Sequence, residues 1–177
     1  MNDALASLLT LLAYTGARTN EIAGLSLADV VVDDSPDGIS HLIIRPNDLR
    51  SLKNHSSRRT IPLLGEALKS VRTLLSRRTK TSSVALFQQY GRDGGQTAVS
   101  ASLMKHLRAT GVNEKTKIIH SLRHTIKQAL RDVGCPKDVS DALQGHSSGD
   151  ASENYGTGHN LKIVAEWLNK AYGTVGL

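Results

Sequence analysis

The sequence of 177 residues contains a single cysteine, Cys135, so no internal disulfide can form. A reducing compartment is therefore expected, with the thiol beside a helix end. Long apolar runs are also missing. The run at residues 8–14 is too short to span a bilayer, and Asp3 precedes it where a signal peptide would carry basic residues. We expect this run to form a core helix of a soluble intracellular protein with no membrane partner.

The sequence has fewer acidic than basic residues, with 16 Asp and Glu against 22 Lys and Arg, which gives a formal net charge of +6. This balance suits a polyanionic partner, because cationic side chains release the counterions that surround a nucleic acid. A solvated basic surface would give the same composition. No internal repeat is visible, and the length fits one domain that buries about two-thirds of its unfolded surface.

The pattern of apolar residues predicts a mainly α domain with one small antiparallel sheet. The first helix starts at Asn2 or Asp3 and ends at Gly16, and a short second helix starts at Thr19 or Asn20 and ends before Asp29. Further helices are predicted at 66–78, 99–110 and 120–134, then from Pro136 to Gly145, and at 161–172. Strands are predicted at 30–32, 39–45 and 59–63, and a loop at 79–96.

Only four tyrosines are present, and their surroundings differ. Tyr14 lies in an apolar helix and is expected in the core, Tyr172 is expected to anchor the last helix, and Tyr90 is expected on a loop. Tyr155 has no apolar neighbours for several residues on either side, and it follows a segment rich in Gly and Ser. We therefore expect Tyr155 to be exposed rather than packed.

Two arginines in separate segments, Arg18 and Arg123, suit a phosphodiester substrate. A phosphodiester that approaches a five-coordinate transition state gathers negative charge on its non-bridging oxygens. Guanidinium groups meet this charge with planar, permanently charged, bidentate donors. Any one arginine in so basic a sequence is most often a solvated surface group, so the inference depends on the other groups beside them.

The remaining groups fit a phenol that attacks phosphorus. A free tyrosine has a pKa of about 10, so Tyr155 needs a base or a positive field to react at neutral pH. His120 and His146 flank the arginines in sequence and could supply both. The departing sugar hydroxyl needs a proton, and Lys53, at the tip between the last two predicted strands, is placed to deliver it.

Together these residues resemble the catalytic domain of the tyrosine recombinases, the phage integrase family. The matching segments are TGARTNE at 15–21, Lys53 followed by RTIPL at 59–63, HSLRHT at 120–125, GHS at 145–147, and Tyr155 nine residues after His146. The match runs through nearly the whole chain in the right order. It is therefore much more specific than any single segment.

The resemblance implies the recombinase catalytic-domain fold and a site-specific recombinase or integrase. Such an enzyme cleaves and rejoins DNA through a 3′-phosphotyrosyl bond, freeing a 5′-hydroxyl, for integration or excision of a phage or other mobile element. No metal and no cofactor is implied. By resemblance, Glu21 orients Arg18, and the catalytic roles fall on Arg18, Lys53, His120, Arg123, His146 and Tyr155.

The resemblance also implies partners and a location. Double-stranded DNA is the expected partner, bound by a tetramer of protomers, with a monomer or weak oligomer without DNA. The expected location is the bacterial cytoplasm, in association with the nucleoid. Ile163, Val164, Trp167 and Leu168 form one apolar stripe on the last predicted helix. We expect this stripe to be buried, either on its own domain or on a neighbouring protomer.

Some features depart from the family pattern. Residues 1–177 are expected to form only the catalytic domain, without the core-binding and arm-binding domains that normally come before it. Gln144 stands where an apolar residue is common before Gly145. Other basic residues are candidates for contacts with DNA, namely Arg50, Arg58, Arg59, Lys105 and Lys117, with His106 and Arg108 also possible.

Two other function classes fit parts of the sequence. His120 and His124 have the spacing of zinc ligands on a helix, and His146 or His159 could complete a hydrolytic metal site. However, Ser121 stands where metalloproteases place a glutamate. The second alternative is a DNA-binding module without chemistry, which covalent trapping on a nicked duplex would distinguish from a recombinase.

Overall fold

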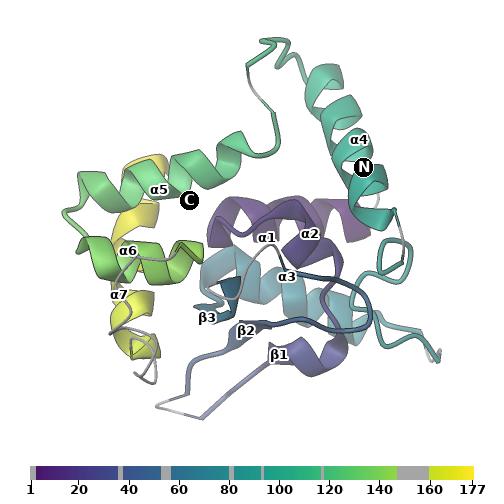
Figure 1. The fold of residues 1–177 in the computed structure, drawn as a ribbon, viewed down its shortest axis with the longest axis horizontal. Helices are drawn as coiled ribbons and strands as arrows, with labels where there is room; N and C mark the ends of the chain where they lie inside the picture. Colours follow the sequence, from purple (N-terminus) through teal and green to yellow (C-terminus); the bar gives the residue numbers. More distant parts are fainter. Residues whose placement is uncertain are drawn as a thin grey trace.

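The computed structural model describes residues 3–35, 38–52, 57–79, 82–92, 94–116, 118–146 and 160–177 (Figure 1). Its helices are α1 (Asp3–Thr15), α2 (Thr19–Ala23), α3 (Gly65–Ser76), α4 (Gly95–Ala109), α5 (Ser121–Asp132), α6 (Lys137–Gln144) and α7 (Leu161–Val175), with a 3₁₀ turn η1 (Leu27–Asp29). The strands are β1 (Val30–Val31), β2 (His41–Ile44) and β3 (Arg59–Pro62). The prediction of a mainly α domain with a small sheet is confirmed.

The three strands form one antiparallel sheet in the order β1-β2-β3. Leu42 on β2 lies opposite Ile61 on β3, and both side chains are fully buried. Leu42 and Ile44 point to the same face because side chains alternate along a strand, and that face packs on the core. The sheet lies along one side of α1, α2 and α3 (Figure 1).

Helix α1 supplies the centre of the core through Leu8, Leu11 and Leu12, which are buried. The helix ends at Thr15 because Gly16 adopts the left-handed conformation, with φ of +62°, as predicted. A Cβ on Gly16 would lie 3.2 Å from the side chain of Ile126, so α5 approaches this turn closely. The next residues of the chain therefore start from a rigid point next to α5.

Helices α5, α6 and α7 group together on one side of the molecule (Figure 1). Helix α7 packs on α5 and on β3 of the same chain, and Val164, Leu168 and Tyr172 are buried. The Tyr172 hydroxyl donates to the carbonyl of Tyr14 at 2.8 Å, as expected for an anchor of the last helix. Val164 and Leu168, two of the four residues of the predicted stripe on α7, are therefore covered by the chain's own domain.

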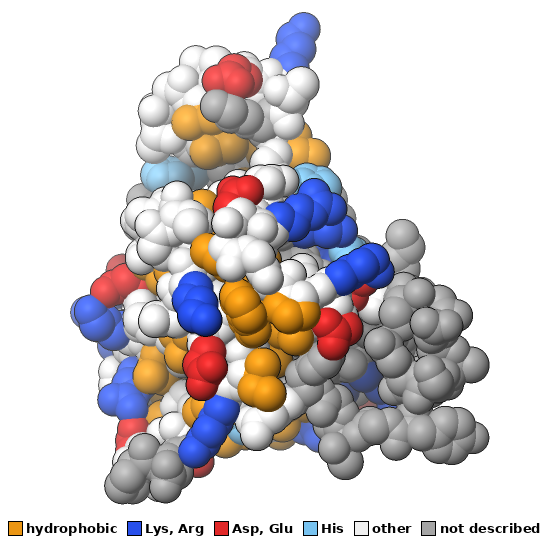
Figure 2. Space-filling view, turned by 90° about the vertical axis from the view of Figure 1, so that its left-hand side faces the viewer, with side chains coloured by type: hydrophobic (Ala, Val, Ile, Leu, Met, Phe, Trp, Pro, Cys, Tyr) orange, Lys and Arg blue, Asp and Glu red, His pale blue; other side chains and the backbone are white. Residues whose placement is uncertain are grey.

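Ile163 is a correction to the predicted stripe, because its side chain is 43% exposed. Trp167 is only partly buried, and the Lys170 ammonium lies 4.2 Å from the centre of its ring. Figure 2 shows this side of the molecule, where apolar side chains gather between charged ones. The apolar stripe therefore extends beyond the residues of α7 that pack against α5, onto the exposed surface of the helix.

The loop predicted at 79–96 contributes to the core more than expected. Leu86, Phe87 and Tyr90 are buried, so Tyr90 lies on the predicted loop but packs into the core. The segment is held by backbone hydrogen bonds, from the amide of Leu86 to the carbonyl of Leu25 and from the amide of Leu27 to the carbonyl of Val84. These hydrogen bonds to the chain after α2 place the side chains in the core. The polar, Gly-containing composition of the segment did not predict this burial.

Cys135 lies half-buried between α5 and α6, at the helix end where it was expected. Burial, with Asp138 nearby, raises the pKa of its thiol to about 11. The described part of the chain contains no helix with the length and hydrophobicity needed to cross a membrane.

Candidate active site

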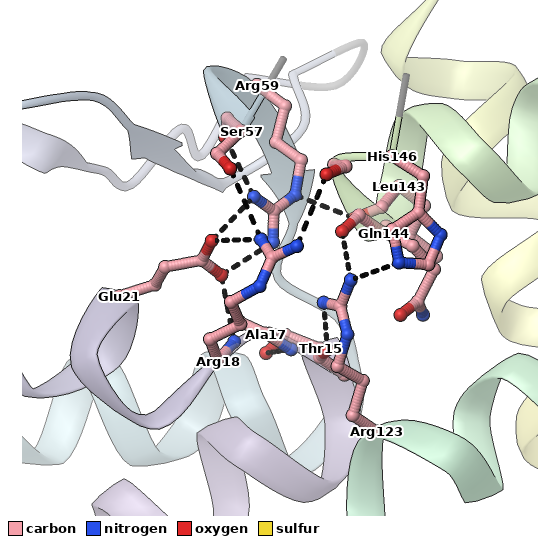
Figure 3. Close-up of polar contacts among 12 residues, drawn as sticks. Thr15, Ala17, Arg18, Glu21, Ser57, Arg59, Arg123, Leu143, Gln144 and His146 are labelled. Atoms are coloured by element: carbon pink, nitrogen blue, oxygen red, sulfur yellow. Dashed lines mark hydrogen bonds and ion pairs between the residues drawn. The ribbon is translucent and has the colours of Figure 1, made fainter. Parts of the chain in front are cut away.

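Three arginines meet at the C-terminal end of α6 (Figure 3). The last carbonyls of a helix have no partner within the helix and carry the negative end of its dipole. Here three consecutive carbonyls each accept from a different guanidinium: Leu143 from Arg59 Nε at 2.7 Å, Gln144 from Arg123 Nη2, and Gly145 from Arg18 Nη2 at 3.4 Å. The helix end thus gathers side chains from α2, β3 and α5.

Glu21, in the first turn of α2, is the carboxylate of this cluster. Its side chain is 1% exposed and accepts from Arg18 Nη1 at 2.8 Å and from Arg59 Nη2 at 2.8 Å. The backbone amide of Arg18 donates to the same carboxylate at 2.8 Å. These contacts have the geometry required to orient Arg18, the role expected of Glu21 from the resemblance.

The ionisation of Glu21 follows from these contacts. Burial raises the pKa of its carboxyl, but the hydrogen bonds and charges of Arg59 and Arg18 outweigh burial and hold the pKa at about 2. Glu21 is therefore an anion at neutral pH. It neutralises part of the positive charge of the two arginines that it joins.

Arg123 on α5 is buried, and within the described residues it pairs with no carboxylate. Its Nη1 donates to the carbonyl of Gly16 at 2.9 Å. Burial, together with the charges of Arg18 and Arg59, lowers its pKa to about 10, although Glu21 opposes this. Arg123 still carries its charge at neutral pH, so the cluster holds three guanidinium groups and one carboxylate.

His146 directly follows the end of α6 and lies against Arg123. Its Nε2 is 3.2 Å from Arg123 Nη2, and a guanidinium can only donate, so Nε2 accepts and the ring proton lies on Nδ1. Nδ1 faces Asp141 Oδ1 at 3.6 Å. Burial, Arg123 and Lys127 lower the pKa of His146, against the opposite effect of Asp141. The imidazole is therefore neutral at neutral pH.

His120 lies one helical turn before Arg123, at the N-terminal end of α5. Its side chain is exposed, and its ring packs edge-on against His124 with 5.0 Å between the centroids. Partial desolvation and the charges of His124, Arg123 and Arg18 lower its pKa. A neutral, accessible imidazole at this point could accept a proton from a bound reactant.

The structure brings together four of the expected catalytic and supporting residues: Arg18, Glu21, Arg123 and His146 (Figure 3). His120 lies one turn before Arg123 on α5. Lys53 and Tyr155 lie outside the described residues, as does Lys117. Sequence reasoning did not single out Ser57, whose Oγ accepts from Arg18 Nη1 at 3.3 Å, or Asp141. Ser57 adjoins Arg58 in sequence, whereas Asp141 lies five residues before His146 and gave no signal.

Arg50, one of the candidates for contact with DNA, is bonded within the fold. This residue is 8% exposed, and its guanidinium donates to the carbonyls of Glu21 at 2.6 Å and Ile43 at 3.1 Å. It also pairs with Asp29 at 3.3 Å and donates to the carbonyl of Arg45. These bonds hold Arg50 inside the fold, with its donors already used by protein acceptors.

The other basic candidates differ in exposure. The side chain of Arg59 is 5% exposed and makes hydrogen bonds within the cluster. Arg58 and Lys105 are exposed, and His106 is half-buried. Arg108 donates to the carbonyl of Val112 in the loop after α4.

The zinc alternative gains no support from the geometry. Across the described ranges, no three histidine, cysteine, aspartate or glutamate side chains lie close enough to hold a metal ion. His120 and His124 form a pair only, and His159 is outside the described residues.

Residues 2–160 match the model of the phage integrase family. The chain belongs to this family. Two curated relatives from Corynebacterium glutamicum are the tyrosine recombinase XerC, 28% identical over 94% of this chain and 50% of the relative, and the tyrosine recombinase XerD, 32% identical over 84% and 46%. The chain thus spans about half the length of the curated relatives it matches.

Solved structures agree on the fold of this integrase-family chain. The XerH site-specific recombinase bound to its difH substrate has a TM-score of 0.64 at 20% identity, over 93% of this chain and 45% of that one. The XerA recombinase has a TM-score of 0.62 at 20% identity, covering 98% of this chain and 57% of that one. The Tn1549 transposon integrase in complex with circular intermediate DNA has a TM-score of 0.58 at 21% identity, covering 93% of this chain and 58% of that one. The predicted recombinase catalytic-domain fold is confirmed.

Proposed function

We propose that this chain cleaves and rejoins DNA strands as the catalytic domain of a site-specific tyrosine recombinase. The observation that carries the proposal is the cluster at the end of α6, where Arg18 and Arg123 lie beside a neutral His146 with more positive than negative charge. Such a cluster suits a phosphodiester, because guanidinium groups stabilise the charge that develops on its oxygens. Membership of the phage integrase family supports the same proposed function.

In the proposed reaction, the Tyr155 oxygen bonds to the scissile phosphorus and the bond from phosphorus to the 5′ oxygen breaks. The phenol proton passes to a neutral histidine, for which His120 is our candidate, and Lys53 gives a proton to the departing 5′ oxygen. The 3′-phosphotyrosyl bond keeps the bond energy, so the reverse attack by a 5′-hydroxyl reseals a strand. Arg18 and Arg123 bind the phosphate throughout.

Double-stranded DNA is the proposed partner, in line with the DNA complexes of XerH and the Tn1549 integrase. A tetramer on DNA, weak association without it, and a bacterial cytoplasmic location near the nucleoid belong to the same proposal. The bacterial origin of the XerC and XerD relatives supports the location. The biological role proposed is integration or excision of a mobile element.

Covalent trapping tests the proposal. The purified chain is incubated with a pool of short nicked duplexes of randomised sequence, in which cleavage releases a fragment and prevents rejoining. We expect wild-type protein to give an adduct with DNA that survives denaturing electrophoresis, and Tyr155→Phe to give none. Tyr90→Phe, which alters a buried tyrosine away from the cluster, is the matched control and should still form the adduct. Identical gels for wild type and Tyr155→Phe would favour the module that binds DNA without chemistry.

A further inference from the structure

Arg59 belongs to the cluster at the end of α6, and its side chain is 5% exposed. It makes four hydrogen bonds: from Nε to the carbonyl of Leu143 at 2.7 Å, from Nη1 to Glu21 at 3.1 Å and to the carbonyl of Ser57 at 2.8 Å, and from Nη2 to Glu21 at 2.8 Å. A guanidinium has five N–H donors, so little capacity is left for another ligand. Burial alone does not set Arg59 apart, because Arg123 is equally buried. The four filled donors of Arg59 are what leave it poorly placed to bind a phosphate.

The packing around Arg59 is tight as well as polar. A Cβ on Gly145 would lie 2.7 Å from Arg59 Nη1, closer than real Cβ contacts allow. Gly145 also has φ of +62°, a left-handed conformation that glycine adopts without steric cost. The turn at the end of α6 and the guanidinium of Arg59 therefore constrain each other.

Arg59 holds the same three segments that hold Arg18. Arg18 bonds to Glu21 at 2.8 Å, to Ser57 Oγ at 3.3 Å and to the carbonyl of Gly145 at 3.4 Å. Arg59 bonds to the same carboxylate, to the backbone carbonyl of Ser57, and to the helix end two residues before Gly145. Each support of Arg18 is thus fixed by a bond from Arg59, as Figure 3 shows.

Charge gives a second link between the two arginines. Glu21 shares its single negative charge between Arg18 and Arg59, so neither guanidinium is fully neutralised. Without Arg59, the carboxylate would pair with Arg18 alone and weaken the positive field that a phosphate would meet. Arg59 therefore supports Arg18 both by position and by charge.

We propose that Arg59 is a positioning residue for the proposed strand cleavage, acting through Glu21 and the end of α6 to hold Arg18 and His146 without contacting the scissile phosphate. The inference rests on the proposed function. It replaces the expectation that Arg59 binds DNA directly, and it assigns that surface role to exposed neighbours such as Arg58.

The first test compares Arg59→Lys with Arg72→Lys in the trapping reaction on the nicked duplex pool. Lysine keeps the charge but has a single nitrogen and cannot make the four bonds of the guanidinium. We expect Arg59→Lys to slow adduct formation about a hundredfold, because a displacement of about 1 Å in a catalytic group costs that much. The salt dependence of DNA binding should stay at its wild-type slope, since no phosphate contact is lost. Arg72→Lys should form the adduct at the wild-type rate, because Arg72 is an exposed arginine on α3 that pairs with Asp34.

A neutral substrate separates positioning from direct contact. A methylphosphonate at the nick-proximal phosphates of the pool removes the negative charge that Arg18 is proposed to stabilise. The defect of Arg18→Ala should shrink on this substrate, whereas the defect of Arg59→Lys should persist. Equal relief of the two variants would overturn the inference, because it would place Arg59 on the phosphate.

A measurement on the wild-type protein covers the case in which Arg59→Lys does not fold. In an NMR titration with the uncleaved duplex pool, the Arg18 Nε–H resonance should shift strongly and that of Arg59 only slightly. A larger shift at Arg59 than at Arg18 would overturn the inference, as would wild-type cleavage by folded Arg59→Lys. If wild-type protein forms no adduct at all, the proposed function fails, and the inference fails with it.

Discussion

Two buried carboxylates in this protein each hold two arginines, and only one of them lies at the candidate active site. The pairs are Glu21 with Arg18 and Arg59, and Asp29 with Arg45 and Arg50. Both carboxylates are buried, and both have lowered pKa values, although burial raises each. By burial and pairing alone, the two clusters would be hard to tell apart.

Their surroundings differ. Asp29 also accepts hydrogen bonds from the backbone amide of Ser26 and from Asn47 Nδ2. Arg50 donates further hydrogen bonds to the backbone carbonyls of Glu21 and Ile43. That cluster ties η1 to the chain after β2. Glu21 instead lies next to a third guanidinium, Arg123, which has no carboxylate partner among the described residues. Excess positive charge beside a neutral histidine, rather than a buried ion pair as such, distinguishes the candidate site.

The largest expected effect is on the rate of strand cleavage, which should depend on an arginine of the Glu21 cluster region and not on an arginine of the Asp29 cluster. Arg123→Lys should slow covalent adduct formation by about a hundredfold to a thousandfold, because a point charge cannot reproduce bidentate stabilisation of the transition state. DNA binding should be mostly retained. Arg50→Lys, the matched change in the Asp29 cluster, should lower the melting temperature and leave the rate per folded molecule unchanged. Equal losses of binding and cleavage for Arg123→Lys would contradict the role proposed for it.

The next effect concerns stability in acid. The pKa of Glu21 is about 2 in the folded protein against 4.5 for a free carboxyl, so its contribution is fully present above pH 4.5 and is lost as pH falls through 2. This shift corresponds to about 3 kcal/mol. Glu21→Gln should therefore lose about 3 kcal/mol of unfolding free energy at neutral pH and show a flatter pH dependence in chemical denaturation between those values.

Asp29→Asn provides the control for that experiment. It should also lower stability, because the pKa of Asp29 is lowered in the fold. Adduct formation per folded molecule should fall for Glu21→Gln but hold for Asp29→Asn. Equal losses of cleavage in both variants would show that the Glu21 cluster has no functional role beyond that of the Asp29 cluster.

The smallest effect concerns a buried polar group without a partner. Gln144 is fully buried, and neither its side-chain oxygen nor its nitrogen makes a hydrogen bond within the described structure. Gln144→Leu should raise the unfolding free energy by about 1 kcal/mol, since it removes an unsatisfied buried amide of similar size. The melting temperature should rise by about 2–4 °C in calorimetry. The backbone carbonyl that Arg123 uses is kept, so cleavage should not change.

Gln128→Leu is the matched control, because that side chain is exposed and bonds to Asp132 at 2.7 Å. It should not raise stability. A loss of stability in Gln144→Leu would show that its amide has a partner, such as a buried water.

Local features of the sequence predicted much of this molecule. Gly16 and Gly145 ended their helices as expected, and Pro136 preceded α6, because these residues act on their own backbone conformation. The role of Glu21 toward Arg18 came from the family resemblance, and the structure shows the two side chains paired at 2.8 Å. Family resemblance supplied His120, His146 and Arg123 in the right order.

Local reasoning failed where the environment comes from elsewhere in the chain. Arg50 and Arg59 belong to the same basic hairpin as Arg58, yet only Arg58 is exposed. Tyr90 sits in a polar segment and is buried, while Ile163 lies on an apolar stripe and is exposed. In each case, the packing of a distant segment decided whether the side chain meets solvent.

The chain alone specified which residue types were available, where its helices begin and end, and which neighbours one turn apart could pair. The folded arrangement decided which arginine is structural, which one supports another, and which one keeps an unbalanced charge. Backbone conformation and helix ends depend on interactions among a few adjacent residues. Burial and charge balance depend instead on contacts across long stretches of sequence, such as that between Arg59 and the carbonyl of Leu143, which arise only when the core has packed.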